Sequence, residues 1–249
     1  MKVALFGGTF DPVHLGHLEV ARAAADKFEL NTVYFVPADI PPHKQSRHLT
    51  DFQHRFAMLA LATADDKRFV PSLLDAPKGS PNYTIDTVRR VKRTLKKSDK
   101  LYFLIGVDAF KDIATWYQPE ALLAECEFIV VSRPGFSIAD IRDALPEKLR
   151  PAEETLPGAR NQQSSDTIAV PGATIYLLPD IHNRVSSTQI RAAVSRPVRQ
   201  LSRFVPKTVA EYIKKERLYT GAAAGDLKDT AQSKVLSFQK ARHHVHRTQ

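Results

Sequence analysis

Short runs of β-branched and aromatic residues alternate along the chain with longer segments whose apolar residues recur every three or four positions. The first kind of run predicts a strand and the second an amphipathic helix. In the segment 84–97, for example, Ile85, Val88 and Val91 share one helical face. On this basis we expect strands at residues 3–6, 32–37, 69–74, 101–105, 128–132 and 174–178, and helices at 15–28, 51–64, 84–97, 109–124, 187–195 and 206–218.

The order of these segments predicts the fold class. The expected strands are apolar with little polar alternation, which is typical of a parallel sheet covered on both faces. Strands that alternate with helices are joined by right-handed crossovers when the sheet is parallel. The sequence therefore predicts an α/β protein with a doubly wound, mostly parallel sheet.

Two stretches interrupt the alternation. Residues 136–172 are rich in Pro, Gly, Ser and acidic residues, and we interpret them as a long insertion with one short helix. Residues 221–249 begin with Gly-Ala-Ala-Ala-Gly and contain few large apolar residues, so we expect a mobile C-terminal tail. The expected organisation is a single domain over residues 1–220, with the insertion inside it and the tail after it.

Composition narrows the cellular context and the class of ligand. The 249 residues include one cysteine, Cys126, which excludes a disulfide framework and a metal site built from cysteines. We find no signal peptide and no apolar run near the roughly 18 residues of a membrane span, so we expect a cytoplasmic protein without a membrane partner. The net charge of +9 suits either nucleic acid or a small polyanion such as a nucleotide.

A first group of candidate functional residues follows directly after the first expected strand. Gly7 and Gly8 end that strand, at a position where the backbone of an α/β sheet can approach a ligand closely. His14 and His17 follow at the start of a helix, so both imidazoles can project from one face beside an anion-attracting helix N-terminus. Such a pair could instead cap or pack the helix, or bind zinc, although the sequence shows no third zinc ligand.

A second polar cluster marks the start of the helix expected at 187–195. Ser186, Ser187 and Thr188 can cap that helix and leave backbone N–H donors exposed. Arg191 lies one turn further on and could reach a phosphate with a forked, charge-assisted contact. By itself, such a run of hydroxyl residues is more often a simple helix cap.

Together the two clusters resemble the signatures of one family. Residues 7–17 read G-G-T-F-D-P-V-H-L-G-H, and residues 185–191 read V-S-S-T-Q-I-R. These are similar to the GGTFDPxHxGH and ISSTxIR signatures of the HxGH nucleotidyltransferases, with Val185 in place of isoleucine. The resemblance covers residues 1 to about 135 and 174–220, and it implies a Rossmann-like nucleotidyltransferase fold.

Further segments resemble one branch of that family, the bacterial nicotinate-nucleotide adenylyltransferases. They are P-P-H-K at 41–44, N-Y-T-I-D-T at 82–87, I-G-V-D at 105–108, T-W-Y at 115–117 and S-R-P-G at 132–135. The resemblance implies that ATP transfers its adenylyl group to nicotinate mononucleotide in NAD biosynthesis. The products are nicotinate adenine dinucleotide and pyrophosphate, and Mg²⁺ accompanies ATP.

The resemblance also implies a role for each motif residue. The catalytic residues would be His14, His17 and Arg191. The residues that contact nicotinate mononucleotide would be Lys44, Tyr83, Thr84 and Trp116. The residues that bind ATP would be Gly8, Thr9, Phe10, Gly106, Asp108, Arg133, Ser187 and Thr188. Mg²⁺ would be bound mainly through the ATP phosphates, with no metal ligand from protein side chains.

Other functions stay open at this point. A phosphopantetheine adenylyltransferase or a cytidylyltransferase would share the first motif. An aminoacyl-tRNA synthetase also carries an HxGH element, but the chain is short for one and has no K-M-S-K-S segment. A nucleic-acid-binding protein would fit the basic charge, but the Arg and Lys residues at 89–97 most simply form a solvated helix face, and we expect no nucleic-acid partner. The sequence leaves the oligomeric state open and allows a homo-oligomer.

Overall fold

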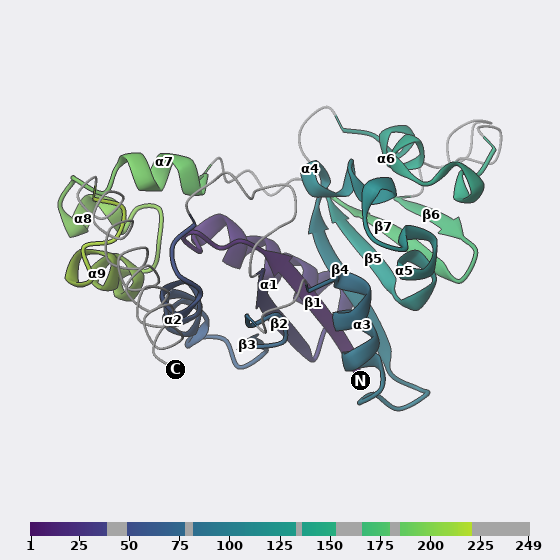
Figure 1. Cartoon of the computed structure of the whole chain (residues 1–249), viewed down its shortest axis with the longest axis horizontal. Coiled ribbons are helices and arrows are strands. Elements are labelled where there is room, and N and C mark those ends of the chain that lie inside the picture. Colours follow the sequence, from purple (N-terminus) through teal and green to yellow (C-terminus); the bar gives the residue numbers. More distant parts are fainter. Residues whose placement is uncertain (39–48, 78–81, 133–135, 153–165, 180–184, 221–249) are drawn as a thin grey trace, which may run out of the picture.

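Seven strands form one sheet in the part of the chain that the computed structural model describes, which is residues 1–38, 49–77, 82–132, 136–152, 166–179 and 185–220 (Figure 1). The strands are β1 (Lys2–Gly8), β2 (Thr32–Pro37), β3 (Phe69–Pro71), β4 (Lys100–Gly106), β5 (Glu127–Val131), β6 (Thr167–Val170) and β7 (Ala173–Leu178). Their order across the sheet is β3-β2-β1-β4-β5-β7-β6, and every neighbouring pair is parallel except β6 with β7. The predicted α/β class with a mostly parallel sheet is confirmed.

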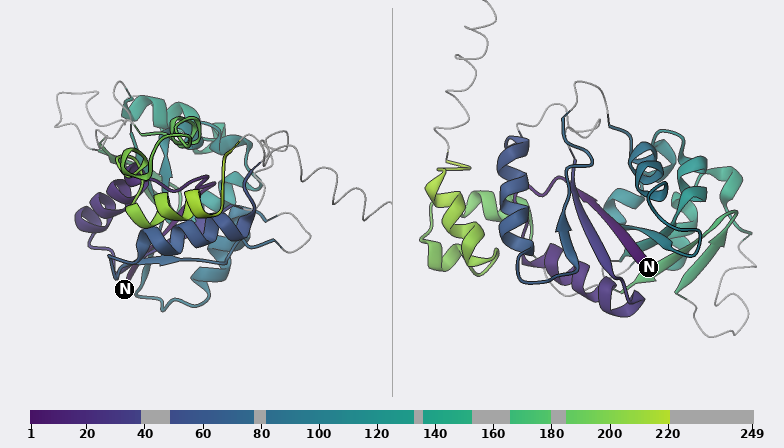
Figure 2. Two further views of the ribbon diagram at one scale, coloured as in Figure 1. Left: turned by 90° about the vertical axis from the view of Figure 1, so that its left-hand side faces the viewer. Right: turned by 90° about the horizontal axis from the view of Figure 1, so that it is seen from below.

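Helices cover both faces of this sheet (Figures 1 and 2). The α-helices are α1 (Leu15–Phe28), α2 (Phe52–Thr63), α3 (Thr84–Lys92), α4 (Val107–Phe110), α5 (Pro119–Glu125), α6 (Ile138–Ala144), α7 (Ser187–Ala192), α8 (Val198–Leu201) and α9 (Lys207–Lys215). Two short 3₁₀ helices, η2 (Ile113–Thr115) and η3 (Glu147–Leu149), complete the described elements. Within those residues, no helix is long and apolar enough to cross a membrane.

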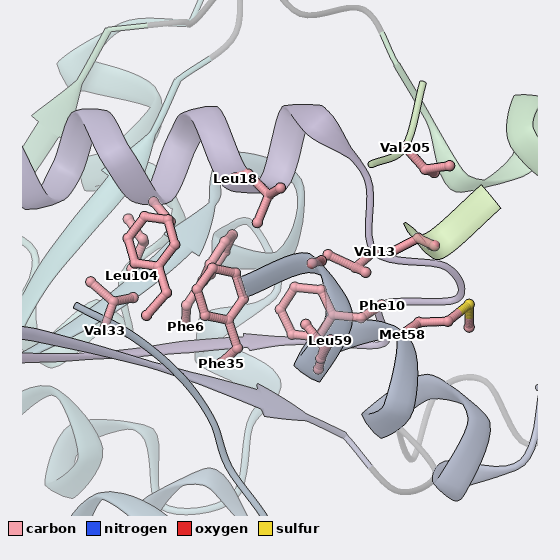
Figure 3. Close-up of a cluster of buried hydrophobic side chains, with 14 of the residues drawn as sticks. Phe6, Phe10, Val13, Leu18, Val33, Phe35, Met58, Leu59, Leu104 and Val205 are labelled. Atoms are coloured by element: carbon pink, nitrogen blue, oxygen red, sulfur yellow. The ribbon is translucent and has the colours of Figure 1, made fainter. Parts of the chain in front are cut away.

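The strands supply alternate residues to two apolar cores. In β1, Ala4 and Phe6 join the core beneath α1, α2 and α7–α9, while Val3 and Leu5 join the core beneath α3–α6. Figure 3 shows the first of these cores, with Phe6 between the sheet and α1. Because both faces of the strands are buried, their residues are apolar throughout, as the sequence pattern indicates.

The strand order creates a switch point between β1 and β4. The chain moves from β1 to β2 in one direction across the sheet, and from β4 to β5 in the other. Ligands of open α/β sheets bind beyond the carboxyl ends of the strands at such a point. Gly8 and Gly106 end the two strands concerned.

The helix predicted over 109–124 is wrong. The chain instead forms α4, η2 and α5, with Trp116 in the gap between η2 and α5. The break lies at Gln118, whose φ is +50°, directly before Pro119 at the start of α5. Proline disfavours a helical conformation in the residue before it and is well suited to a first helical position.

The prediction for residues 136–172 was incomplete. The expected short helix is α6, with Ser137 as its cap, but β6 also lies in this stretch and forms the edge of the sheet. Pro171 and Gly172 connect β6 to β7, and Gly172 has a φ of +91° that suits a tight turn. The end of the predicted insertion therefore belongs to the sheet.

Other predicted boundaries agree more closely. Helix α1 and strand β2 have the predicted bounds, whereas β3 ends at Pro71 and α3 at Lys92, earlier than predicted. Pro71 lies on an edge strand, where the missing backbone N–H breaks no inner ladder. The tail predicted at 221–249 lies outside the described residues, so the single-domain interpretation stays a prediction.

Helices α7, α8 and α9 group together beside α2 at one end of the molecule (Figures 1 and 2). The link to α2 includes a hydrogen bond between His54 Nδ1 and the Tyr212 hydroxyl, at 2.8 Å. In Figure 3, Val205, which precedes α9, lies near Val13 and Met58. This packing brings α7 and the residues after α9 onto the loop that follows β1.

Candidate active site

The two motif histidines form a stacked pair at the start of α1. Their ring centroids are 3.6 Å apart and the planes differ by 24°. His14 is the residue before the first helical turn, and its main-chain N–H donates to His17 Nδ1 at 3.2 Å. A neutral His17 ring therefore carries its proton on Nε2, which leaves an N–H donor for a ligand.

Burial keeps both imidazoles neutral near pH 7. It lowers the pKa of His14 to about 4. It also lowers the pKa of His17 well below the usual value, and the neighbouring His14 lowers it further. Among the described residues, His14 Nδ1 is buried without a hydrogen-bond partner. A buried polar atom left in this state is typical of a site that binds a ligand.

Phe10 packs its side chain against the His17 ring. Its side chain is 1 % exposed, and its ring meets the His17 ring edge to face with centroids 5.0 Å apart (Figure 3 shows Phe10 in the core). Its φ of +48° is unusual for a residue with a Cβ and marks local strain of the kind found at functional sites. Any contact between Phe10 and ATP would therefore involve its backbone.

The structure gives the two glycines of β1 a packing role. A Cβ on Gly8 would lie 3.0 Å from the Phe10 ring, and one on Gly7 would lie 3.2 Å from Phe103. A side chain at either position would crowd an aromatic ring, because rings close over them from the two faces of the sheet. Gly106 differs, since a Cβ there would meet nothing within 4 Å. Open space at Gly106 fits a ligand at the switch point.

The second motif lies against the first. Ser186 caps α7 by accepting a hydrogen bond from the Gln189 N–H at 3.2 Å. The Ser187 hydroxyl donates to the Pro12 carbonyl at 3.0 Å, and Arg191 Nη1 donates to the Asp11 carbonyl at 2.7 Å. Both side chains therefore support the loop between β1 and α1, a role that we had not predicted for them.

Three further predicted ATP contacts lie beside Arg191 or just after β1 and β4. Thr188 accepts a hydrogen bond from Arg191 Nη2 at 3.2 Å, so it lies beside the same guanidinium. Asp108 lies exposed in α4, just beyond the end of β4, and Thr9 directly follows β1. The predicted ATP residues thus surround the switch point, apart from Arg133, which lies outside the described residues.

The predicted nicotinate residues meet on the opposite face of the sheet, which α3–α6 cover. The rings of Tyr83 and Tyr117 stack, with centroids 4.2 Å apart and planes 29° apart. Trp116 is partly buried and stands edge to face against Phe103, with centroids 6.2 Å apart. Thr84 begins α3 directly after Tyr83. The structure brings these residues together, whereas Lys44 lies outside the part of the chain that it describes.

Three residues near the β1–α1 loop have structural roles that the sequence analysis did not predict. Asp11 is 3 % exposed, and its carboxylate accepts a hydrogen bond from the Tyr219 hydroxyl at 2.8 Å. Arg55 is 2 % exposed and donates to the carbonyls of Thr9, Ala38 and Thr50 at 2.7–2.8 Å. For Asp11 the available signal was its place inside the first motif, and for Arg55 it was a charged residue in the buried stripe of a mostly apolar helix. No local signal in the sequence pointed to Tyr219.

The structure also provides evidence on two alternatives, a zinc site at the histidine pair and a nucleic-acid-binding face. Over the described residues, no group of three or more His, Cys, Asp or Glu side chains could hold a metal ion, so the histidine pair has no partner there for a zinc site. On α3, Arg89 and Lys92 both contact the Glu125 carboxylate at 2.9 Å. These two basic side chains therefore stabilise the contact between α3 and α5, which weakens the case for a nucleic-acid-binding face.

Comparisons with known proteins agree with this geometry. Residues 5–193 match the model of the cytidylyltransferase-like family. A probable nicotinate-nucleotide adenylyltransferase of Geobacter sulfurreducens is 37 % identical over 227 residues, which cover 88 % of this chain and 98 % of the relative. A protein of the same name from Moorella thermoacetica is 37 % identical over 220 residues, covering 88 % and 91 %.

Solved structures show the same fold. The Plasmodium falciparum nicotinic acid mononucleotide adenylyltransferase complexed with NaAD has a TM-score of 0.63 at 20 % identity, covering 88 % of this chain and 97 % of that one. The motifs at the switch point, the family match and the close sequence relatives thus agree. The chain belongs to the cytidylyltransferase-like family and, within it, to the nicotinate-nucleotide adenylyltransferases.

Proposed function

We propose that this protein transfers the adenylyl group of ATP to nicotinate mononucleotide, giving nicotinate adenine dinucleotide and pyrophosphate. The 5′-phosphate of the mononucleotide attacks the α-phosphorus of ATP, the bond to the bridging oxygen breaks, and pyrophosphate leaves. The substrate supplies the nucleophile, so the protein has to position the reactants and stabilise the charge that develops.

The stacked histidines would bind the phosphates of ATP. Two neutral rings at the N-terminus of α1 offer ring N–H groups beside the positive end of a fourteen-residue helix. Binding of a polyanion there would favour protonated imidazole and so raise both lowered pKa values. His17 Nε2–H would then donate to the oxygens on which negative charge accumulates in the transition state.

Arg191 has two parts in the proposal. It holds the Asp11 carbonyl through Nη1, and its positive charge beside Thr188 would attract the leaving β,γ-phosphates. Mg²⁺ would arrive with ATP and be held by phosphate oxygens and water, supplying charge neutralisation. The one carboxylate of the first motif, Asp11, is already bonded to the Tyr219 hydroxyl, which fits a metal bound through its substrate.

The aromatic residues Tyr83, Trp116 and Tyr117 would determine which acceptor the enzyme uses. We propose that Trp116 stacks on the pyridine ring, next to the Tyr83–Tyr117 pair. The N–H groups of the first turn of α3, at Thr84 and Ile85, would receive the nicotinate carboxylate. Lys44 and Arg133 keep the roles implied by the resemblance, beside the mononucleotide phosphate and the adenine respectively.

The single observation that carries the proposal is the stacked His14–His17 pair at the switch point. The Tyr83–Tyr117 stack, on the opposite face of the sheet, supports the choice of acceptor. The test is pyrophosphate release from ATP and Mg²⁺ with nicotinate mononucleotide, nicotinamide mononucleotide or phosphopantetheine as acceptor. We expect release with the nicotinate form at least about tenfold faster than with the others. Release with phosphopantetheine alone would retain the role of the histidines and overturn that of Trp116.

A further inference from the structure

The carboxylate of Asp11 joins the first motif to Tyr219, which follows α9. It lies between Phe10 and Pro12 and is buried. Its Oδ1 accepts a hydrogen bond from the Tyr219 hydroxyl at 2.8 Å, and its Oδ2 accepts one from the Thr50 N–H at 3.4 Å. Since the side chain is turned into the protein, the carboxylate fixes the loop rather than contacting a substrate.

The backbone after α9 is shaped to deliver Tyr219 to this position. Arg217 has a φ of +52°, and the N–H of Leu218 donates to the Ile213 carbonyl at 3.0 Å, as in a Schellman motif. Leu218 is buried in the core beneath α1 and α2. Tyr219 follows with a φ of +63°, a second left-handed residue that redirects the chain toward the β1–α1 loop.

The hydroxyl of Tyr219 acts as a donor in this contact. Burial raises the pKa of the phenol far above its usual value, and the Asp11 charge raises it further. The phenol therefore keeps its proton at any physiological pH and can donate to the carboxylate. A hydrogen bond from a neutral donor to a buried carboxylate is directional and costly to lose.

We propose that Tyr219 is a positioning residue for the adenylyl transfer, holding the β1–α1 loop through Asp11 in the geometry that the histidine pair requires. The inference rests on the proposed function. Asp11 lies between Phe10, whose ring contacts His17, and Pro12, whose carbonyl Ser187 holds. A shift of the Asp11 carboxylate would move both neighbours, and misplacement of about 1 Å in a catalytic site can cost up to about 10²-fold in rate.

The test compares two tyrosines of the same C-terminal region. Tyr219→Phe removes the hydroxyl bound to Asp11, and Tyr212→Phe removes the hydroxyl bound to His54, also at 2.8 Å. Both variants keep the aromatic ring and lose one hydrogen bond, but only the first bond reaches the motif loop. We expect Tyr219→Phe to lower kcat about tenfold and to raise the ATP KM about threefold, with the KM of nicotinate mononucleotide within about twofold. We expect Tyr212→Phe to keep the wild-type kcat and KM values.

A double-mutant cycle shows whether Tyr219 affects kcat through Asp11. Asp11→Asn, alone and combined with Tyr219→Phe, would show whether the two residues act together. We expect the double variant to lose no more kcat than Asp11→Asn alone. Additive losses would overturn the proposal, because Tyr219 would then act by another route.

Thermal unfolding and ATP binding keep this test separate from that of the proposed function. The ATP Kd, measured by calorimetry, does not depend on the acceptor, and we expect Tyr219→Phe to weaken it about threefold and Tyr212→Phe to leave it unchanged. If wild-type protein bound ATP but adenylated no acceptor, the proposed function would fail while this comparison still held. A Tyr219→Phe variant with a lower Tm but wild-type kcat and ATP Kd would show a purely structural role and overturn the inference.

Discussion

The two halves of the candidate site are built in different ways. The phosphate half, around the β1–α1 loop, is held by side chains from distant segments: Arg55 of α2, Ser187 and Arg191 of α7, and Tyr219 after α9. The acceptor half, around Trp116, consists of aromatic rings from two neighbouring segments, with Tyr117 half exposed.

The contrast fits what each half would have to do under the proposed function. Charge stabilisation requires donors that are fixed before the reaction, because reorganisation during the reaction would cost free energy. Stacking on a flat ring tolerates more freedom, because a π-face has no single required direction. We therefore expect changes in the phosphate half to lower kcat, and changes in the acceptor half to raise the KM of one substrate.

The largest expected effect lies in the phosphate half. Replacing His17 with alanine should lower kcat by about 10²-fold or more, because one preorganised donor is lost. Steady-state pyrophosphate release measures this. The matched control is His54→Ala, a histidine on α2 that bonds Tyr212, and it should keep kcat within about twofold. Activity of His17→Ala within about threefold of wild type would remove His17 from the mechanism.

The stacked histidines His14 and His17 should make the folded protein less stable at acidic pH. The unfolded chain binds a proton at His14 near pH 6.5, whereas the folded state binds it only near pH 4. The unfolded state therefore holds more protons between these values, and the free energy of unfolding falls as the pH is lowered through this window. His14 alone should account for about 2 kcal/mol at pH 5 relative to pH 7.5.

Urea unfolding at both pH values tests this effect. His17 acts in the same direction, since its pKa is also lowered. A His14→Gln variant should lose less stability on acidification than wild type. Equal losses in the two proteins would show that His14 is not buried in its neutral form.

In the acceptor half, Trp116→Ala should raise the KM of nicotinate mononucleotide about tenfold, as expected for loss of one stacked base. The ATP KM should stay within about twofold. Trp116→Phe keeps a stacking face and should recover much of the affinity. A parallel rise in both KM values would instead show that the whole pocket had collapsed.

The smallest effect concerns the turn that supports the phosphate half. Arg217 adopts a left-handed conformation at the end of α9. Glycine there carries no Cβ penalty, so Arg217→Gly should raise the free energy of unfolding by about 0.5–1 kcal/mol. Both KM values should stay unchanged. A lower urea midpoint would show that the Arg217 side chain makes a contact worth more than the strain.

Much of the fold was predictable from local pattern. The alternation of buried strands with amphipathic helices predicted the sheet, and Pro119 and the Pro171–Gly172 pair were available signals for the two errors at η2–α5 and β6. In both places a proline marks the boundary. From periodicity alone we predicted one helix that runs across Pro119, and we did not predict the four-residue edge strand β6.

The site was predictable only in part. The His14–His17 spacing places two rings on one face, a local property that the helix geometry determines. The links from Tyr219 to Asp11 and from Arg191 to the Asp11 carbonyl join residues 208 and 180 positions apart. Such contacts depend on the packing of α7 against the β1–α1 loop and of α9 against α2, which no local sequence pattern specifies.

The most direct test of the two-part site is a crystal structure of the protein with nicotinate adenine dinucleotide bound. We expect the phosphates beside His14 and His17, the pyridine ring against Trp116, and its carboxylate at the first turn of α3. A pyridine ring bound away from Trp116, or phosphates away from the histidine pair, would contradict the account.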